Sequence, residues 1–424
     1  MILNYVWIAF FIIAFVVALF RVAGYCFPQL FAVFHLSFTQ ADAEVFGTML
    51  QSIFQMSGMA VNIAIYLIGV MTFWLGMLKI GEKAGAIEVM MKAIRPLFKK
   101  LFPSVPDNHP AMGSMMMNLC ATMLGLESAA TPMGLKAMNE LQKINSSKDE
   151  ASDAQLMYFI MVVTGFMLLP VNILALRGAA GAKNPADVLI PLVMTTFIAS
   201  FSGVLIVAIK QKINLFNKVI VLYGLGGIVV LGTMLYGLSC LSPSQAQAAG
   251  KFAGSFLILC FIIFFLSLAF QKKLNIFETF IEGAKEGFDT AVKIIPYLVA
   301  MLVAIGVFRA SGAMDILIGT IVKITHWLGF DGDLAGALPV ALMKPFSGNG
   351  ARGLMIEAMQ HYGADSFTGR LASLFQGATD TTFYVLAMYF GSVNIRRTRY
   401  ALGIALLCDL IGIVTAIVMA KMFF

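Results

Sequence analysis

Charged side chains are scarce in this sequence. Asp, Glu, Lys and Arg make up 12% of the 424 residues, whereas 60% are hydrophobic and the mean hydropathy is +0.88. Soluble domains carry about twice that share of charge, so an ordinary soluble fold is excluded. The apolar residues gather in runs close to the roughly 20 residues that a helix needs to cross a bilayer. They predict an all-α polytopic membrane protein with about nine crossings, at residues 5–20, 61–78, 156–176, 189–209, 219–241, 252–270, 294–308, 371–390 and 400–418.

The sequence also has few residues that bind metals or react. Its five cysteines and four histidines include no Cys-x-x-Cys pair and no histidines at metal-ligand spacing, so we expect neither a disulfide framework nor a metal site. The 28 methionines are deformable packing residues and, alone, a weak basis for soft-metal transport. The sequence shows no nucleophile beside a base and no Walker-type phosphate loop. We therefore expect no enzyme activity, no metal and no cofactor.

The basic residues lie at the ends of the apolar runs. Between Pro28 and Leu78 the chain has no Lys or Arg, whereas Lys79 to Lys100 contains six. By the positive-inside rule the second crossing ends in the cytoplasm, which places the N-terminus in the cytoplasm and the C-terminus on the opposite, periplasmic or extracellular side. Anionic headgroups account for the net charge of +7. The expected partners are membrane lipid and a small-molecule solute, without nucleic acid; a homo-oligomer is compatible with the sequence, although no motif indicates one.

The chain contains the same membrane unit twice, in opposite orientations. Residues 41–212 form the first copy and residues 277–424 the second; residues 1–40 add an N-terminal crossing, and residues 213–276 link the copies as a hairpin of two crossings. In each copy an amphipathic basic stretch, at 84–102 and 278–293, predicts a helix in the membrane interface. Inverted repeats are how many secondary transporters build two alternately open faces around one site. Two short motifs occupy corresponding positions in the copies, Gly134-Leu135-Lys136-Ala137-Met138 in the first and Gly353-Leu354-Met355-Ile356-Glu357-Ala358-Met359 in the second.

Each copy has a hairpin that is too short and interrupted to cross the membrane twice. In residues 118–141 an apolar half-helix is followed by a break and by a second half-helix, which we expect Thr131 to cap, with Pro132 in its first turn. In residues 344–353 Ser347 or Asn349 can cap the helix that follows. Arg352 adds a cation to the first turns of that helix, whose N-terminus favours binding of an anion. Irregular backbone at membrane depth survives only where it lines a cavity or is buried in protein. A turn at the membrane surface stands as the alternative for the second hairpin.

A polar stretch interrupts the apolar run at residues 371–390. It reads Gln-Gly-Ala-Thr-Asp-Thr-Thr at residues 376–382, which is costly in a membrane unless these residues face water, protein or a solute. The first copy has a weaker counterpart, with Thr164 and Gly165 followed by Pro170 and Asn172. Both positions predict broken helices.

Three acids lie well inside the apolar segments, Glu127, Asp380 and Asp409. An acid within a membrane is by default a functional-site hypothesis, and each of these is a candidate for ion coupling. For Asp409, a structural ion pair with Lys344 or Arg352 stands as the alternative. For Glu127, the alternative is a helix cap or an acid at the cytoplasmic rim.

The hairpin sequences resemble those of a known family. Residues 118–138, with Gly125 and Ala129-Ala130-Thr131-Pro132, are similar to spore maturation A proteins; Pro345-Phe346-Ser347-Gly348-Asn349-Gly350 and the run 376–387 are similar to spore maturation B proteins. The chain thus resembles a fusion of the two, within the nucleoside-recognition, or gate, domain family. The resemblance implies a gate-type fold akin to parts of concentrative nucleoside transporters and ferrous-iron permeases, and names no substrate. Thr122 and Ser128 stand where the A-type pattern usually has asparagine, so no amide contact is carried over to them.

These observations favour an inner-membrane secondary transporter or permease for a small polar solute, with anions among the candidates. Its site is expected between the two hairpins, and Asp380 or Asp409 would carry a coupling proton. The alternative is a non-transporting membrane scaffold needed for envelope or spore-cortex maturation, which predicts a stable protein partner. The residues expected to line the site are Asn118, Glu127, Ser128, Thr131, Ser347, Asn349, Arg352, Gln376, Thr379, Asp380 and Thr381.

Overall fold

The protein is all-α. The structure, a computed structural model, describes residues 2–31, 37–106, 108–241, 243–327 and 334–424. In these ranges the only β-type pairing is one isolated bridge between Glu150 and Arg397. Within the same ranges, seven helices are long and apolar enough to cross a membrane, as expected of a multi-pass membrane protein. They are α1 (Ile2–Cys26), α4 (Val45–Ala84), α10 (Leu189–Lys210), α11 (Lys218–Ser239), α12 (Pro243–Gln271), α13 (Ile276–Ala310) and α19 (Ala401–Phe423).

Two of the nine expected crossings are broken helices. The run 156–176 divides into α8 (Asp153–Thr164) and α9 (Val171–Ala179), and the run 371–390 divides into α17 (Phe367–Ala378) and α18 (Thr382–Gly391). We call residues 165–170 the first break and residues 379–381 the second break. Gly165 leaves α8 in the left-handed region at φ +41°, and Thr379 leaves α17 in extended backbone. Seven of the nine expected crossings are thus continuous helices and two are broken ones, and the two predicted interruptions are confirmed.

The elements recur in the same order in both halves of the chain. Each half has a long helix, a hairpin of two short helices, a broken helix and a closing span. In the first half these are α4, α6 (Pro110–Met123) with α7 (Glu127–Lys143), α8 with α9, and α10; in the second they are α13, α15 (Leu338–Met343) with α16 (Gly348–Tyr362), α17 with α18, and α19. The remaining helices are α2 (Pro28–Phe31), α3 (Gln40–Ala43), α5 (Ala86–Leu101), η2 (Pro185–Val188) and α14 (Ala313–Trp327).

The long helices α4 and α13 lie side by side and run in opposite directions. A Cβ at Gly283 would lie 2.4 Å from the carbonyl oxygen of Leu75, and a Cβ at Gly306 would lie 2.4 Å from the side chain of Met56. Residue numbers therefore rise along one helix as they fall along the other. Small residues let two backbones approach this closely within a membrane. The antiparallel pair shows that the two repeats are inverted.

The two amphipathic stretches do not fold alike. Residues 86–101 form the separate helix α5, because Gly85 turns the chain at φ +88° after α4. The corresponding helix expected at 278–293 is wrong, since α13 continues through these residues without interruption. Gly283 and Gly287 hold this part of α13 against the backbone of α4. Close packing against α4 thus takes the place of an interfacial position.

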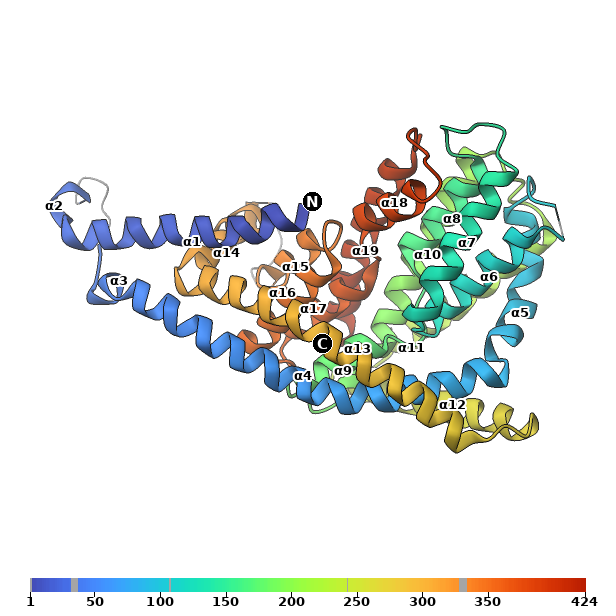
Figure 1. The fold of residues 1–424 in the computed structure, drawn as a ribbon, viewed down its shortest axis with the longest axis horizontal. Coiled ribbons are helices and arrows are strands. Elements are labelled where there is room, and N and C mark those ends of the chain that lie inside the picture. Colours follow the sequence, from blue (N-terminus) through green and yellow to red (C-terminus); the bar gives the residue numbers. More distant parts are fainter. Residues whose placement is uncertain (1, 32–36, 107, 242, 328–333) are drawn as a thin grey trace.

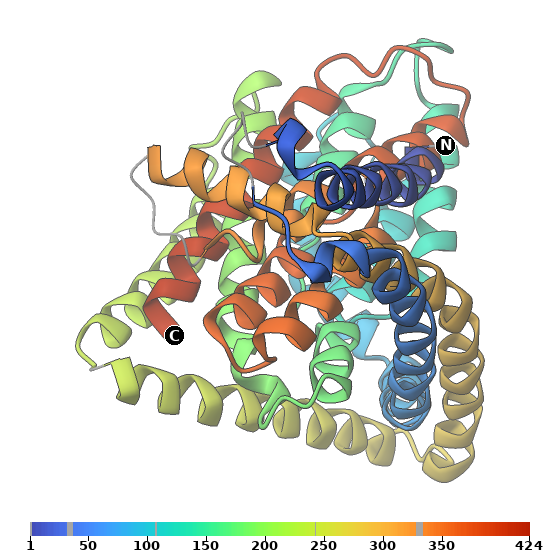
Figure 2. The same cartoon turned by 90° about the vertical axis from the view of Figure 1, so that its left-hand side faces the viewer.

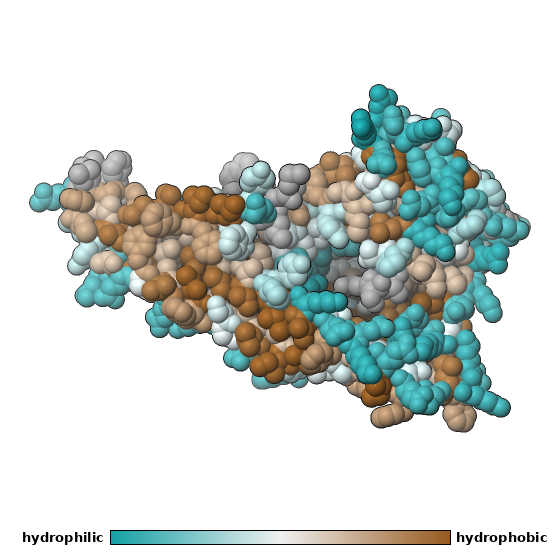
Figure 3. Space-filling model, in the orientation of Figure 1, coloured by the Kyte–Doolittle hydropathy of each residue, from teal (hydrophilic) through white to brown (hydrophobic). Residues whose placement is uncertain are grey.

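The molecule has an apolar arm and a broader body. Figure 1 shows α1, α14 and adjoining parts of α4 and α13 in the arm, with the first hairpin, α8, α10 and α18 in the body. Figure 2 shows α12 crossing along one edge of the molecule. In Figure 3 the arm is largely hydrophobic, whereas the far end of the body is hydrophilic. Exposed side chains on α4 include Phe54 (71% exposed) and Ile65 (63% exposed), as expected of a surface that faces lipid.

Candidate functional site

The first hairpin, α6 and α7, touches the first break with its tip. The carbonyl oxygen of Met123 accepts hydrogen bonds from the backbone N–H groups of Leu168 (2.9 Å) and Leu169 (3.2 Å). Gly125 turns the tip at φ +77°, where a Cβ would lie 2.6 Å from the carbonyl oxygen of Leu169. Only glycine combines that backbone conformation with so close an approach. Unpaired donors of the first break are thereby satisfied by the hairpin.

The second hairpin, α15 and α16, touches the second break in the same way. The carbonyl oxygen of Pro345 accepts from the backbone N–H of Phe383 at 3.0 Å, just beyond the second break. The rings of Phe346 and Phe383 stack at 5.0 Å. Ser347 caps α16, its Oγ accepting from the N–H of Gly350 at 3.0 Å, which confirms one of the two expected caps. These contacts pack the second hairpin against the second break.

The two broken helices meet at their breaks. The backbone N–H of Asp380 donates to the carbonyl oxygen of Val163 at 2.7 Å, so the second break closes over the last turn of α8. Helix α8 also contacts α18, and α17 contacts α9. The Asp380 side chain itself is exposed, and its Oδ1 accepts from the N–H of Thr381 at 2.6 Å. The centre of the fold is thus built from interrupted backbone contributed by both repeats.

A buried carboxylate stands directly against the second break. Asp409 on α19 accepts hydrogen bonds from the hydroxyl groups of Thr379 and Thr382, both at 2.7 Å. Asp409 is 4% exposed and Thr382 is fully buried. At the first break the corresponding contact is neutral, with the hydroxyl of Ser200 donating to the carbonyl oxygen of Thr164 at 3.2 Å. Of these two matching contacts, one carries an acid and the other does not.

Two buried polar atoms beside the start of α16 have no hydrogen-bond partner among the described residues. Gln376 is 6% exposed; its Nε2 donates to the carbonyl oxygen of Gly348 at 3.4 Å, while its Oε1 is unpaired. Nε of Arg352, one turn further along α16, is also unpaired. An unmade hydrogen bond of this kind costs about 1–3 kcal/mol. Buried unpaired groups beside a helix N-terminus form an arrangement that can accept a polar ligand.

Asn118 joins the first hairpin to both broken helices. Its Nδ2 donates to the carbonyl oxygen of Ala130 at 2.7 Å, which ties α6 to α7. Its Oδ1 accepts from the hydroxyl of Tyr158 on α8 at 2.8 Å, and Nδ2 lies 3.4 Å from the hydroxyl of Tyr389 on α18. The hydroxyl of Tyr389 reaches into the space that Gly134 leaves open on α7. Asn118 is therefore engaged with protein, and the two tyrosines were not among the residues expected from the sequence.

Other expected site residues lie differently from their predicted positions. Helix α7 begins at Glu127 rather than at Pro132, so the expectation that Thr131 caps this helix is wrong. The chain turns earlier because Gly125 supplies the left-handed residue that the break needs, and Thr131 becomes an exposed position inside the helix. Asn349 is also exposed. The side chains of Glu127 and Ser128 lie outside the part of the chain that the structure describes.

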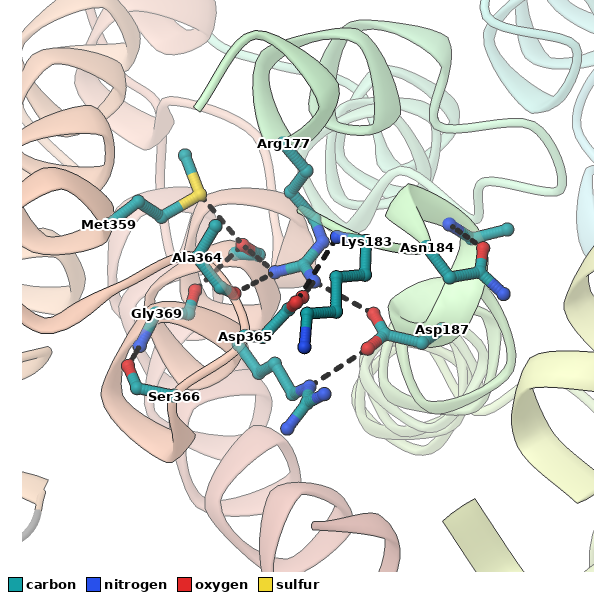
Figure 4. A network of polar contacts seen from close by, with 12 residues as sticks. Arg177, Lys183, Asn184, Asp187, Met359, Ala364, Asp365, Ser366 and Gly369 are labelled. Atoms are coloured by element: carbon teal, nitrogen blue, oxygen red, sulfur yellow. Dashed lines mark hydrogen bonds and ion pairs between the residues drawn. The ribbon is translucent and has the colours of Figure 1, made fainter. Parts of the chain in front are cut away.

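A buried network of ion pairs joins the two repeats at the end of α10 that begins with Leu189 (Figure 4). Asp187, which is 1% exposed, pairs through Oδ1 with Arg177 at 2.8 Å and through Oδ2 with Arg370 at 2.9 Å. Arg177 also donates to the carbonyl oxygen of Ala364 at 2.9 Å and lies 3.6 Å from the carboxylate of Asp365. Only a weak signal for this network is present in the sequence, since Arg177 follows one apolar run and Arg370 precedes another.

An exposed ion pair joins the repeats at the opposite end of α10. Nη1 of Arg399 lies 2.7 Å from Oδ1 of Asp153, with the side chains 34% and 52% exposed. Gln211, just after α10, donates to the carbonyl oxygen of Asp153 at 2.7 Å, which locates this pair. Asp187 and Arg399 each stand two residues before their closing spans, α10 and α19. The two ends thus carry matching contacts, one buried and one open to solvent.

Comparisons with known proteins agree with this architecture. The model of the Gate family, described as nucleoside recognition, matches residues 64–222 and 291–396. Spore maturation protein B of Bacillus subtilis (strain 168) is 47% identical over 153 residues, covering 36% of this chain and 84% of that protein. Spore maturation protein A of the same organism is 35% identical over 156 residues, covering 37% of this chain and 80% of that protein. No solved structure matches the chain significantly.

Proposed function

This chain belongs to the Gate, or nucleoside recognition, family, and from that premise we propose that it is a secondary transporter or permease for a small polar solute in a bacterial inner membrane. Its inverted repeats and interrupted helices are the elements from which such proteins build a central site. The charge distribution supports an N-terminus in the cytoplasm. Lys79 on α4 lies 3.2 Å from the carboxylate of Glu286 on α13, so the charged parts of both helices gather at one end.

The observation that carries the proposal is the pair of unpaired buried atoms at the second hairpin. A solute that accepts a hydrogen bond from Arg352 and donates one to Gln376 would satisfy both atoms at once. The N-terminus of α16 and the guanidinium favour an anionic group on that solute. A polar group that stays unsatisfied in the free protein costs stability, and such costs are typical of binding sites. We therefore place the solute between Gln376 and the first turns of α16.

Asp409 is the candidate for ion coupling. It is buried, and two threonine hydroxyls of the second break donate to it, so a change in its protonation would reorganise the break itself. Asp380 contributes its backbone to the contact between the repeats, and its carboxylate is exposed. We expect Asp409→Asn to abolish the dependence of solute uptake on a pH gradient in liposomes. Asp380→Asn serves as the comparison; coupling that is lost there but kept in Asp409→Asn would move the role to Asp380.

A thermal-shift screen of the purified protein against nucleosides, amino acids, dicarboxylates and short peptides tests the site. A ligand that binds the folded state raises the melting temperature. We expect Gln376→Leu to raise the melting temperature of the free protein, because it removes an unsatisfied buried oxygen, and to abolish the shift caused by the ligand. Asn139→Ala, an exposed change on α7, is the matched control and should leave both unchanged. A ligand whose shift survives Gln376→Leu would remove Gln376 from the site.

A membrane scaffold for spore or envelope maturation is the second candidate. It is favoured by the names of the two relatives, spore maturation proteins A and B. The scaffold proposal expects no solute flux in liposomes and a stable protein partner in mild detergent extracts. Flux that depends on Gln376 would favour the transporter instead.

A further inference from the structure

A second site lies away from the helix breaks, at the junction of α5 and α6. A cavity of about 480 Å³ opens there between the amphipathic helix α5 and the first turns of α6. We propose that this cavity binds the phosphate headgroup of an anionic phospholipid. The proposal is independent of the transported solute, because neither the breaks nor the second hairpin line the cavity.

Two cations on α5 supply the attraction. Lys92 and Arg95 line the cavity on one face of the helix, and both are exposed. Among the described residues, neither has an ion-pair partner. Glu88 is the opposing charge; a Cβ at Gly85 would lie 3.1 Å from its Oε2 and 2.5 Å from Nζ of Lys272, so a cation stands on the same side of this acid. His109 also lines the cavity, and its Nδ1 accepts from the backbone N–H of Ala111 and caps α6.

Beside these charges and the polar Asn108 and His109, the lining includes three methionines and a proline, and this apolar part favours a lipid over a free ion. Met112 and Met116 are buried on the α6 side, and Met91 is half-buried on α5. Flexible methionines adapt to the irregular shape of a glycerol backbone and the start of an acyl chain. A soluble phosphate would gain nothing from this apolar surface. Cations beside apolar side chains are the chemistry of a headgroup site.

Helix α5 has the build of a helix that lies at a membrane surface. Its buried positions include Ile87 and Phe98, whereas its basic residues face outward. The hydroxyl of Tyr223 on α11 donates to the carbonyl oxygen of Ala93, which fixes α5 against a span. A lipid headgroup can therefore reach Lys92 and Arg95 from the bilayer while α5 stays in place. The phosphate would bridge α5 to the first hairpin.

The test uses the purified full-length protein in detergent, with phosphatidylglycerol, phosphatidylcholine of the same acyl chains, or sodium phosphate added. We expect phosphatidylglycerol alone to raise the melting temperature. In Lys92→Ala/Arg95→Ala its apparent affinity should fall roughly 30-fold, the value for loss of two basic side chains near a lipid surface. The matched control, Lys100→Ala/Lys136→Ala, removes the same charge outside the cavity and should keep the affinity of the wild type.

A second variant keeps both cations and fills the cavity. A Cβ at Gly113 meets nothing within 4 Å, so Gly113→Phe can fold normally while its ring occupies the lipid position. It should also lose the phosphatidylglycerol shift. Equal losses in the two double variants would overturn the proposal in favour of general electrostatics. An equal shift with sodium phosphate would make the ligand a soluble anion, and full lipid binding by Gly113→Phe would place the lipid elsewhere.

Discussion

Replacing Asp187 by asparagine should destabilise the protein far more than an ordinary charge change. The carboxylate of Asp187 holds two guanidinium groups, those of Arg177 and Arg370, whose side chains are 0% and 9% exposed. Removal of one partner from a buried ion pair leaves an uncompensated buried charge and costs about 3–5 kcal/mol. With the usual unfolding entropy per residue, spread over the chain of 424 residues, this cost corresponds to a melting temperature lower by about 3–6 °C.

The exposed ion pair at the other end of α10 provides the control. Asp153→Asn removes a carboxylate from Arg399, but the Asp153 side chain is 52% exposed. Exposed pairs contribute about 0–1 kcal/mol, so we expect a shift of about 1 °C or less. The assay is thermal unfolding in detergent at one fixed heating rate. Adding Arg370→Gln to Asp187→Asn should cost less than the sum of the single changes, because it removes a stranded cation. Equal shifts for Asp187→Asn and Asp153→Asn would refute the reasoning.

Three smaller contacts test the helix packing and the entry to α4 by the same melting assay. Gly287→Ala should lower the free energy of unfolding by about 1–3 kcal/mol, because the new Cβ would lie 2.4 Å from a backbone oxygen of α4. Gly58→Ala is the control: its Cβ has open space, so the change should be neutral or stabilising. Equal effects of the two changes would contradict the close packing. Tyr158→Phe leaves the buried amide oxygen of Asn118 without this donor and should lower the free energy of unfolding by about 1–3 kcal/mol. An unchanged melting temperature would show that another donor replaces the hydroxyl. A hydrogen bond from the backbone N–H of Thr39 holds the pKa of Asp42 below its ordinary value of 3.8. The ionised carboxylate therefore contributes its full stabilisation above about pH 4, and this contribution is lost as the pH falls through the lowered pKa. Asp42→Asn should therefore flatten the pH dependence of the melting temperature below about pH 4, and a curve that stays as steep would exclude this contribution.

Local signals in the sequence were enough to locate the interruptions of the helices. Glycine, proline and clustered polar residues inside apolar runs have few places to go in a membrane, so the breaks near Gly165 and Thr379 could be predicted. The cap at Ser347 follows from its side chain and its position before α16. Residue type alone did not decide between Gly125 and Pro132 as the turning point of the first hairpin. There the left-handed glycine and its contact with Leu169 determine where α7 begins.

Contacts between the repeats could not be predicted, because their partners are far apart in the sequence. Arg370 lies 183 residues after Asp187, and nothing near either residue indicates the other. The two threonine hydroxyls that donate to Asp409 were likewise not among its expected partners. The continuity of α13 depends on glycines that pack on a helix more than 200 residues earlier. These contacts form only when distant segments of the chain come together on folding.

The ion pairs at the two ends of α10 also make the halves of this chain complementary rather than interchangeable. The first half supplies Asp187 at one end and Asp153 at the other, and the second half answers with Arg370 and Arg399. Two first halves joined in this way would oppose acid with acid, and two second halves would oppose arginine with arginine. Like charges placed against each other cost several kcal/mol. In these two ion pairs the acid comes from the first half and the arginine from the second, so the pairs favour contact between unlike halves.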